Sequence, residues 1–308
     1  MIQIIIFIGL LIGLLSNSKL ASSYVQEGLS VWAKSALPAL FPFMVLSGLI
    51  IRLGMAERVS KAFKPVLGRL YNASLAACYV VLVGFLCGFP MGARTIAEMY
   101  ERGRLSKREG KWLLAFCNNL GPAYVMGVLF PMLGIKHRLP YLLGFYGIPL
   151  AYGWLLNVIW YSRKNPEANG PSEEADDLAY SRSGRIPAFG NALRESIESA
   201  IYAMLLFGGY LAFFCLLNLF PHVIFQKRQP VLGLMLEVTT GLKAMKGRHP
   251  ILCLCAATFG GLSCIAQTHA ALSHTDLIDS MGEYVLHKMI LTAISLSYYF
   301  ALFRFIGF

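Results

Sequence analysis

Charged side chains are scarce in this chain. Asp, Glu, Lys and Arg make up 14% of the 308 residues, whereas 56% are hydrophobic and the mean hydropathy is +0.59. A water-soluble core of this length cannot bury so much apolar surface, so the composition excludes an ordinary soluble domain. We therefore expect an integral membrane protein with several spans.

Acidic residues are particularly few, with 16 Asp and Glu against 27 Lys and Arg, and the net charge is +11. Most basic residues stand in short connections between apolar runs, where membrane lipid headgroups are the natural partner and nucleic acid is not expected. Because basic connections recur along the whole chain, the positive-inside rule does not fix the orientation.

Enzyme motifs are also missing. The sequence contains no HExxH, GxSxG, P-loop or CxxC pattern, and its seven cysteines have no His at metal-ligand spacing. We expect no enzyme activity, no cofactor and no metal site, and we interpret the cysteines as small buried residues.

The apolar runs indicate an all-α fold. The run Ile2–Leu15 lacks a basic n-region and a small-residue cleavage site, which predicts a retained helix and not a signal peptide. Together with two broken segments we expect about nine membrane elements. The other candidates are Ala39–Leu53, Leu113–Ile135, Leu139–Tyr161, Ile197–Phe220, Val231–Met245 and Tyr284–Ile306.

Two short apolar runs end in glycine-rich breaks. Residues 76–87 run into Gly88-Phe89-Pro90-Met91-Gly92, and residues 251–259 run into Gly260-Gly261-Leu262-Ser263. As helices these runs reach roughly 18 and 13 Å, which is less than a hydrocarbon core of about 30 Å. Backbone groups freed at this depth must be buried in protein or line a wet cavity, and paired breaks are typical of a transporter's binding site.

A polar stretch divides the chain into two distantly similar halves. We assign residues 1–22 to an N-terminal membrane helix, 23–161 to the first half, 162–190 to a solvated linker and 191–308 to the second half. A shift of 173 positions places Gly88, Ala93, Thr95 and Ala97 on Gly261, Ala266, Thr268 and Ala270. This predicts a polytopic protein with two related halves that contain broken or re-entrant helices.

The segment after the first break is suited to an anion. Pro90 fits the opening of a helix, and the free amides of residues 91–93, around Gly92, would form a partly positive helix end. Arg94 and Thr95 follow within one turn. An Arg at this depth needs compensation, which either Glu98 four residues later or an anionic solute could supply.

Further polar residues adjoin other breaks. Asn118 and Asn119 precede Gly121-Pro122 and either cap exposed backbone or bind a polar solute. Ser263 is expected to cap a helix that begins at Cys264, and Gln267 and Thr268 offer neutral hydrogen bonds in the second half. The resulting candidate solute-binding residues are Pro90, Gly92, Arg94, Thr95, Asn118, Asn119, Ser263, Gln267 and Thr268.

Two acidic residues are candidates for coupling a proton or sodium ion. Glu98 follows Arg94 by one helical turn, and Glu237 interrupts an apolar run. An intramembrane Glu is by default a functional hypothesis. Glu237 is therefore a counter-charge to Arg94, an ion site or, if its segment is short and ends near the membrane surface, an ordinary surface residue.

Three motifs resemble one family. GFPMGARTIAEMYERGRLSKREGKWLLAFCNNLGPAYVMG (88–127), LEVTTG (236–241) and FGGLSCIAQTHAALSHTDL (259–277) occur in this order. They resemble the sporulation integral membrane protein family of YlbJ type, in the nucleoside-recognition or Gate domain group, which is distantly similar to concentrative nucleoside transporters. The resemblance covers nearly the whole chain from about residue 30. The second half has no evident counterpart of the Asn-Asn-x-Gly-Pro motif.

The resemblance implies a protein of the outer forespore membrane that passes dipicolinic acid toward the spore. Dipicolinate is a small aromatic dicarboxylate, which is physically compatible with Arg94 and the helix start after Pro90. A nucleoside carrier and a non-transporting scaffold for spore envelope assembly are the alternatives, and the oligomeric state is not predicted. The positions carried over by motif are Gly88, Pro90, Gly92, Arg94, Asn118, Asn119, Gly121, Pro122, Gly261, Ser263 and Gln267.

Overall fold

The computed structural model describes residues 2–161 and 189–306, and every regular element in these two ranges is a helix. Five stretches within them are long and apolar enough to cross a bilayer: Ser18–Arg52, Arg138–Trp160, Phe189–Phe225, Pro250–Leu272 and Asp276–Ile306. The shorter apolar stretches are Leu75–Leu86 and Pro122–Leu133. The chain is an all-α polytopic membrane protein, as its composition predicts.

The first part of the chain contains sixteen labelled elements up to residue 161. They are α1 (Ile2–Ser16), α2 (Ser18–Val31), the π-helical turn η1 (Trp32–Ala36), α3 (Leu37–Arg52), α4 (Ala56–Lys61), α5 (Lys64–Tyr71), α6 (Leu75–Leu86), α7 (Met91–Glu101), α8 (Lys107–Leu114), α9 (Pro122–Tyr124), η2 (Val125–Leu129), α10 (Phe130–Leu133), α11 (Arg138–Leu142), η3 (Leu143–Gly147), α12 (Ile148–Leu156) and η4 (Asn157–Tyr161).

The second part begins beyond the predicted linker, which lies outside the described residues except for positions 189–190. Its elements are α14 (Phe189–Leu216), α15 (Leu219–Phe225), α16 (Pro230–Leu236), α17 (Val238–Met245), α18 (Pro250–Phe259), α19 (Gly261–Leu272), the 3₁₀ turn η6 (Asp276–Ser280) and α20 (Met281–Ile306).

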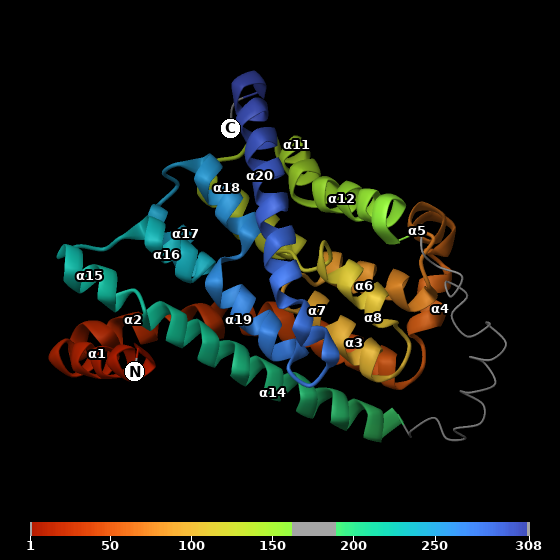
Figure 1. Ribbon diagram of the computed structural model, residues 1–308, viewed down its shortest axis with the longest axis horizontal. Helices are drawn as coiled ribbons and strands as arrows, with labels where there is room; N and C mark the ends of the chain where they lie inside the picture. The colour runs from red at the N-terminus through yellow and green to blue at the C-terminus, as the bar shows by residue number, and fades with distance from the viewer. Residues whose placement is uncertain (1, 162–188, 307–308) are drawn as a thin grey trace.

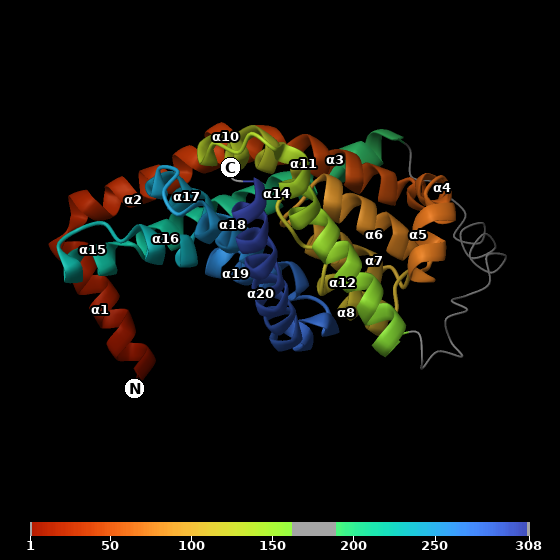
Figure 2. The same cartoon turned by 90° about the horizontal axis from the view of Figure 1, so that it is seen from above.

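Two long helices support the rest of the fold. The continuous run α2–η1–α3 lies alongside α14 (Figures 1 and 2). Small residues permit this close approach: a Cβ built on Gly28 would lie 3.0 Å from Ala212 Cα, and one on Gly208 would lie 2.9 Å from the Trp32 indole. The Trp32 Nε1–H also donates to the Met204 carbonyl at 2.8 Å. We refer to α2–η1–α3 and α14 as the scaffold helices.

Each half contains a short helical hairpin. Helices α6 and α7 form the first, and α16 and α17 form the second. In the second hairpin a glycine brings the two helices together, since a Cβ on Gly241 would overlap the Leu234 backbone. In the first, glycines let both helices approach the break after α8, since Cβ atoms on Gly84 and Gly92 would both overlap the Cys117 carbonyl. Each arm has at most 12 residues, too few to cross the membrane alone.

The second hairpin corrects one prediction. Residues 231–245 were expected to form a single span, but Glu237 has extended backbone angles (φ −140°, ψ 111°) and separates α16 from α17. The polar side chain at this position caps the second helix and so ends the first. The segment is therefore a re-entrant hairpin.

A helix break packs against the tip of the hairpin in each half. A Cβ on Gly88 would overlap the Gly121 backbone, and a Cβ on Gly261 would lie 3.2 Å from the carbonyl oxygens of Leu234 and Met235. By these contacts Gly121 and Gly261 hold equivalent positions, each in a helix break that packs on a hairpin tip. The tip of the first hairpin is likewise equivalent to the region of Glu237. The alignment shifted by 173 positions is wrong in register because it matched a hairpin tip to a helix break through common small residues.

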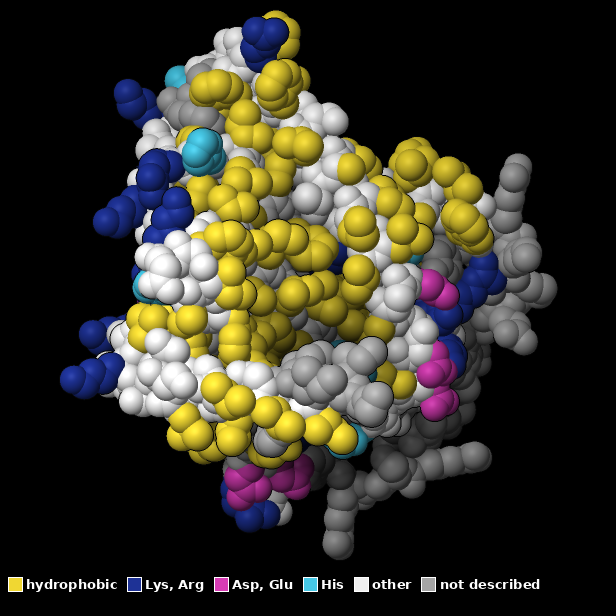
Figure 3. All heavy atoms as spheres, turned by 60° about the vertical axis from the view of Figure 1, so that its left-hand side comes forward, with side chains coloured by type: hydrophobic (Ala, Val, Ile, Leu, Met, Phe, Trp, Pro, Cys, Tyr) yellow, Lys and Arg dark blue, Asp and Glu magenta, His cyan; other side chains and the backbone are white. Residues whose placement is uncertain are grey.

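The outer surface is apolar over a broad band. Figure 3 shows hydrophobic side chains across the middle of one face, with Lys and Arg gathered along one edge. The exposed residues on α14 and α20 include Leu205, Met289 and Phe300, which are 60%, 59% and 56% exposed. Such a surface is stable against lipid chains and is unfavourable in water.

Candidate functional site

The break between α8 and α9 places two amide side chains in the centre of the protein. Asn118 Nδ2 donates to Thr268 Oγ1 at 2.9 Å and to the Tyr284 hydroxyl at 3.1 Å. Asn119 Nδ2 instead donates to the Phe116 carbonyl at 2.6 Å. Asn119 therefore caps freed backbone, whereas Asn118 links the first half to α19 and α20.

Lys288 of α20 joins the two helix breaks, and the sequence analysis did not single it out. Its Nζ donates to the Asn118 carbonyl, to Asn119 Oδ1 at 3.2 Å and to the Thr258 carbonyl at 3.3 Å. The residue is 3% exposed. No described carboxylate forms an ion pair with it. The central polar cluster consists of Asn118, Asn119, Thr258, Thr268, Tyr284 and Lys288.

Arg94 lies on the other face of α7. Gly92 faces Cys117, whereas Arg94, two residues later and roughly opposite around the helix, reaches α14 and donates from Nη2 to Ser199 Oγ. Its Nη1 is buried and has no hydrogen-bond partner. The predicted residues are therefore divided between the central polar cluster and the α7–α14 contact.

Glu98 acts electrostatically on Arg94, but the two side chains form no ion pair. The Glu98 carboxylate pairs with Arg52 at 3.4 Å and with Arg102 at 3.3 Å. The interpretation of an Arg94–Glu98 ion pair is wrong, because two other guanidinium groups occupy that carboxylate. Arg94 is left with a hydroxyl as its partner.

Two expected helix starts also need correction. Helix α7 begins directly after Pro90, but the Met91 N–H already donates to the Gly88 carbonyl at 2.8 Å, so it is not a free amide. Helix α19 begins at Gly261, so Ser263 does not cap a helix starting at Cys264. Ser263 Oγ accepts instead from Gln267 Nε2 at 2.8 Å.

Four predicted site residues carry a buried polar atom without a hydrogen-bond partner. These atoms are Arg94 Nη1, Thr95 Oγ1, Asn118 Oδ1 and Gln267 Oε1. Each such group costs about 1–3 kcal/mol, so a native protein keeps few of them. Helix α7, which carries two, packs against α19, which carries another. These unsatisfied groups are divided between the α7–α14 contact and the neighbourhood of the central polar cluster, and binding of a solute by these residues stays a prediction.

Glu237 is fully hydrogen-bonded by the start of α17. Oε1 accepts from the Thr239 N–H and hydroxyl at 3.0 and 2.8 Å, and Oε2 accepts from those of Thr240 at 2.7 and 2.8 Å. The interpretation of Glu237 as the counter-charge to Arg94 is therefore wrong. Ion coupling by Glu98 or Glu237 stays a prediction. No group of three His, Cys, Asp or Glu side chains in the described ranges could hold a metal.

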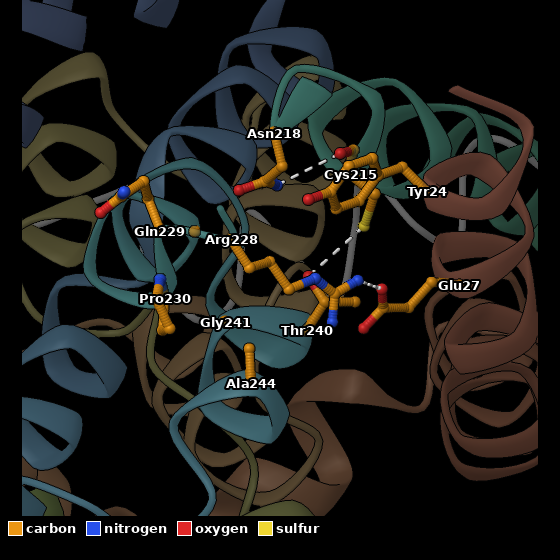
Figure 4. Close-up of a pocket in the computed structure, with 11 residues that line it drawn as sticks. Tyr24, Glu27, Cys215, Asn218, Arg228, Gln229, Pro230, Thr240, Gly241 and Ala244 are labelled. Carbon is orange, nitrogen blue, oxygen red and sulfur yellow. Dashed lines mark hydrogen bonds and ion pairs between the residues drawn. The ribbon is translucent and has the colours of Figure 1, made fainter. Parts of the chain in front are cut away.

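A small cavity lies apart from the predicted residues, where α2, α14 and the second hairpin meet (Figure 4). Its volume is about 20 Å³, which is room for a water molecule and not for an organic solute. Arg228 forms an ion pair with Glu27 at its edge. The central polar cluster itself is packed shut in this conformation.

The chain is similar to the Gate group and to a sporulation membrane protein. A family model for the Gate group, described as nucleoside recognition, matches residues 33–136, which include the first hairpin and the Asn118–Gly121 break. The chain is 23% identical over 306 aligned positions to the sporulation integral membrane protein YlbJ of Bacillus subtilis strain 168. That alignment covers 88% of this chain and 75% of the relative. No solved structure matches the chain.

Proposed function

Because the chain belongs to the sporulation integral membrane protein family of YlbJ type, we propose that it carries a small anionic solute across one membrane by alternating access. We extend the proposal to dipicolinate as the solute and to the outer forespore membrane as the location. The solute crosses unchanged, so the proposal includes no catalytic step.

The observation that carries this proposal is the incomplete hydrogen bonding of Arg94. Its side chain is partly buried and donates to Ser199 Oγ, and its Nη1 is fully buried without a partner, while the nearby Glu98 pairs with other arginines. A buried cation of this kind is costly unless something compensates it. A carboxylate of the solute would do so through a charge-assisted hydrogen bond.

The neighbouring unsatisfied groups support a polar solute with more than one contact. Thr95 Oγ1 can turn its hydroxyl to donate, and the Gln267 amide can present its NH₂ group after rotation. A rigid dicarboxylate has acceptors at both ends and so suits several donors on α7 and α19. Opening of the hairpins against the scaffold helices would supply the space that the closed conformation lacks.

The match to the Gate group favours a second candidate, a nucleoside carrier. Neutral base and ribose groups need amides and hydroxyls more than fixed charge, and the Asn118–Thr268–Tyr284 contacts offer these. Two uptake assays with purified protein in liposomes separate the two: labelled dipicolinate with and without excess unlabelled uridine outside, and labelled uridine in parallel. Uptake that uridine leaves unchanged supports the dipicolinate carrier, and uptake of uridine alone rejects it.

A scaffold protein that does not transport predicts different results from either carrier. In that case neither solute enters the liposomes, and a variant altered at Arg94 still complements a deletion of the gene during sporulation. Joint loss of uptake and complementation in the same variant, at unchanged abundance, contradicts the scaffold.

A further inference from the structure

Lys288 occupies a position where three oxygen atoms from both halves converge. The Asn118 carbonyl and Asn119 Oδ1 come from the break after α8, and the Thr258 carbonyl comes from the last turn of α18, just before Gly260. Carbonyl groups at the end of a helix have no intrahelical partner and carry partial negative charge. The Thr258 carbonyl is such a group, the Asn118 carbonyl belongs to unwound backbone, and Asn119 Oδ1 is a side-chain oxygen; buried together, the three require a cation or donors.

The ammonium group satisfies this requirement completely. Lysine has three N–H donors and no acceptor, and each of the three oxygens accepts one hydrogen bond from Nζ. No described carboxylate pairs with Lys288, so the positive charge is balanced by carbonyl dipoles. This environment differs from an ordinary buried ion pair.

Lys288 differs from Arg94 in that all its hydrogen-bond donors are used. Arg94 keeps Nη1 free for a solute, whereas every donor of Lys288 is used within the protein. Lys288 is therefore not a ligand of the anion in this conformation. It holds the first break against the second.

Oxygens from unwound backbone and helix ends are also the ligands that a sodium ion takes in broken-helix carriers. We propose that the Lys288 ammonium is a covalently attached replacement for a bound monovalent cation, and that the protein needs no sodium ion to hold its two helix breaks together. The consequence for uptake rests on the proposed transport function. The structural part of the proposal does not.

Two substitutions of different size test the structural part. Lys288→Met removes the charge but fills the space, whereas Lys288→Ala removes the charge and leaves room among the three oxygens for a free ion. Thermal unfolding of each purified variant in detergent is measured in sodium chloride, potassium chloride and choline chloride at equal ionic strength. No solute is present.

We expect both variants to unfold at a lower temperature than the wild type in choline chloride. For Lys288→Ala, each tenfold increase in sodium or potassium well above the dissociation constant should raise the midpoint by about 2–4 °C. The wild type and Lys288→Met should give the same midpoint in all three salts. Equal responses of the two variants, or a sodium-dependent midpoint in the wild type, would overturn the proposal.

A variant that fails to fold is still informative. If Lys288→Ala is lost during solubilisation in choline chloride, its recovery in sodium or potassium chloride supports the proposal. Loss of both variants in every salt counts against it, because a free cation then fails to replace the ammonium in Lys288→Ala. Wild-type uptake should be equal with sodium, potassium or choline outside the liposome, and failure of that assay alone would concern transport and not the cation site.

Discussion

Gly88 and Gly121 are packed backbone to backbone, and a Cβ built on Gly88 would overlap both the nitrogen and the Cα of Gly121. Gly88 also has φ +78°, a left-handed conformation that side chains rarely adopt. The Phe89 N–H donates to the Asn119 carbonyl beside this contact. The tip of the first hairpin is thereby fixed against the break that carries Asn118 and Asn119.

Gly88→Ala should strongly destabilise the protein. The left-handed conformation alone costs a non-glycine residue about 1–2 kcal/mol, and the backbone overlap adds to this because neither segment can move without disturbing the centre. Gly103→Ala is the matched control, since Gly103 has φ +68° and open space where its Cβ would be. Thermal unfolding of both variants should show a much larger fall for Gly88→Ala; equal falls would mean that the contact does not matter.

Arg94→Ala should abolish uptake of the anionic solute while the amount of protein in the membrane is unchanged. Arg94→Lys should keep partial uptake, because it retains charge but loses the planar donor geometry. Arg102→Ala is the control: Arg102 also sits near Glu98 but is 42% exposed at its side chain. Lost abundance of Arg94→Ala would instead indicate a structural role.

Glu237→Gln should lower the thermal stability, with a cost of about 1 kcal/mol typical of a lost helix cap. Glutamine offers one acceptor oxygen, whereas the carboxylate accepts from the backbone N–H groups of both Thr239 and Thr240. If Glu237 couples a proton, uptake by Glu237→Gln should lose its dependence on the proton gradient. A variant of unchanged stability would contradict the capping role.

The Arg228–Glu27 ion pair should contribute little to stability. It joins α2 to the connection before the second hairpin, with side chains 46% and 26% exposed, and the Arg228 guanidinium also lies over the Tyr24 ring at 5.0 Å. Exposed pairs of this kind are worth about 0.2–1 kcal/mol. A double-mutant cycle with Arg228→Gln and Glu27→Gln should give a coupling in this range that falls with added salt; a much larger, salt-insensitive coupling would refute this.

The sequence predicted the two breaks because glycine and proline mark them directly. Helix α6 ends at Leu86 and α18 ends at Phe259, each within one residue of the predicted end. Asn118, Asn119 and Thr268 were predicted to bind a solute, which stays a prediction; the structure buries all three and brings Asn118 into contact with Thr268. Composition predicted the membrane setting, and the lengths of the apolar runs predicted the all-α fold.

Other features depend on contacts that spacing does not encode. Lys288 binds carbonyl groups of residues up to 170 positions away, and a backbone carbonyl has no sequence signature. A lone lysine in the apolar run 284–306 was the available signal, because intramembrane charge usually has a role. The Arg94–Glu98 interpretation failed for a related reason: helical spacing identified the nearby carboxylate but not its competitors Arg52 and Arg102.

The dependence of both breaks on Lys288 has a consequence for biogenesis. Because α20 is the final described helix, the ribosome releases Lys288 after the segments that contain Asn118 and Thr258 have already been made. Until α20 inserts, their carbonyl oxygens lack the ammonium that joins them. Lateral docking of α20 therefore joins the two breaks, and nascent chains arrested before α20 should be exposed to membrane proteases.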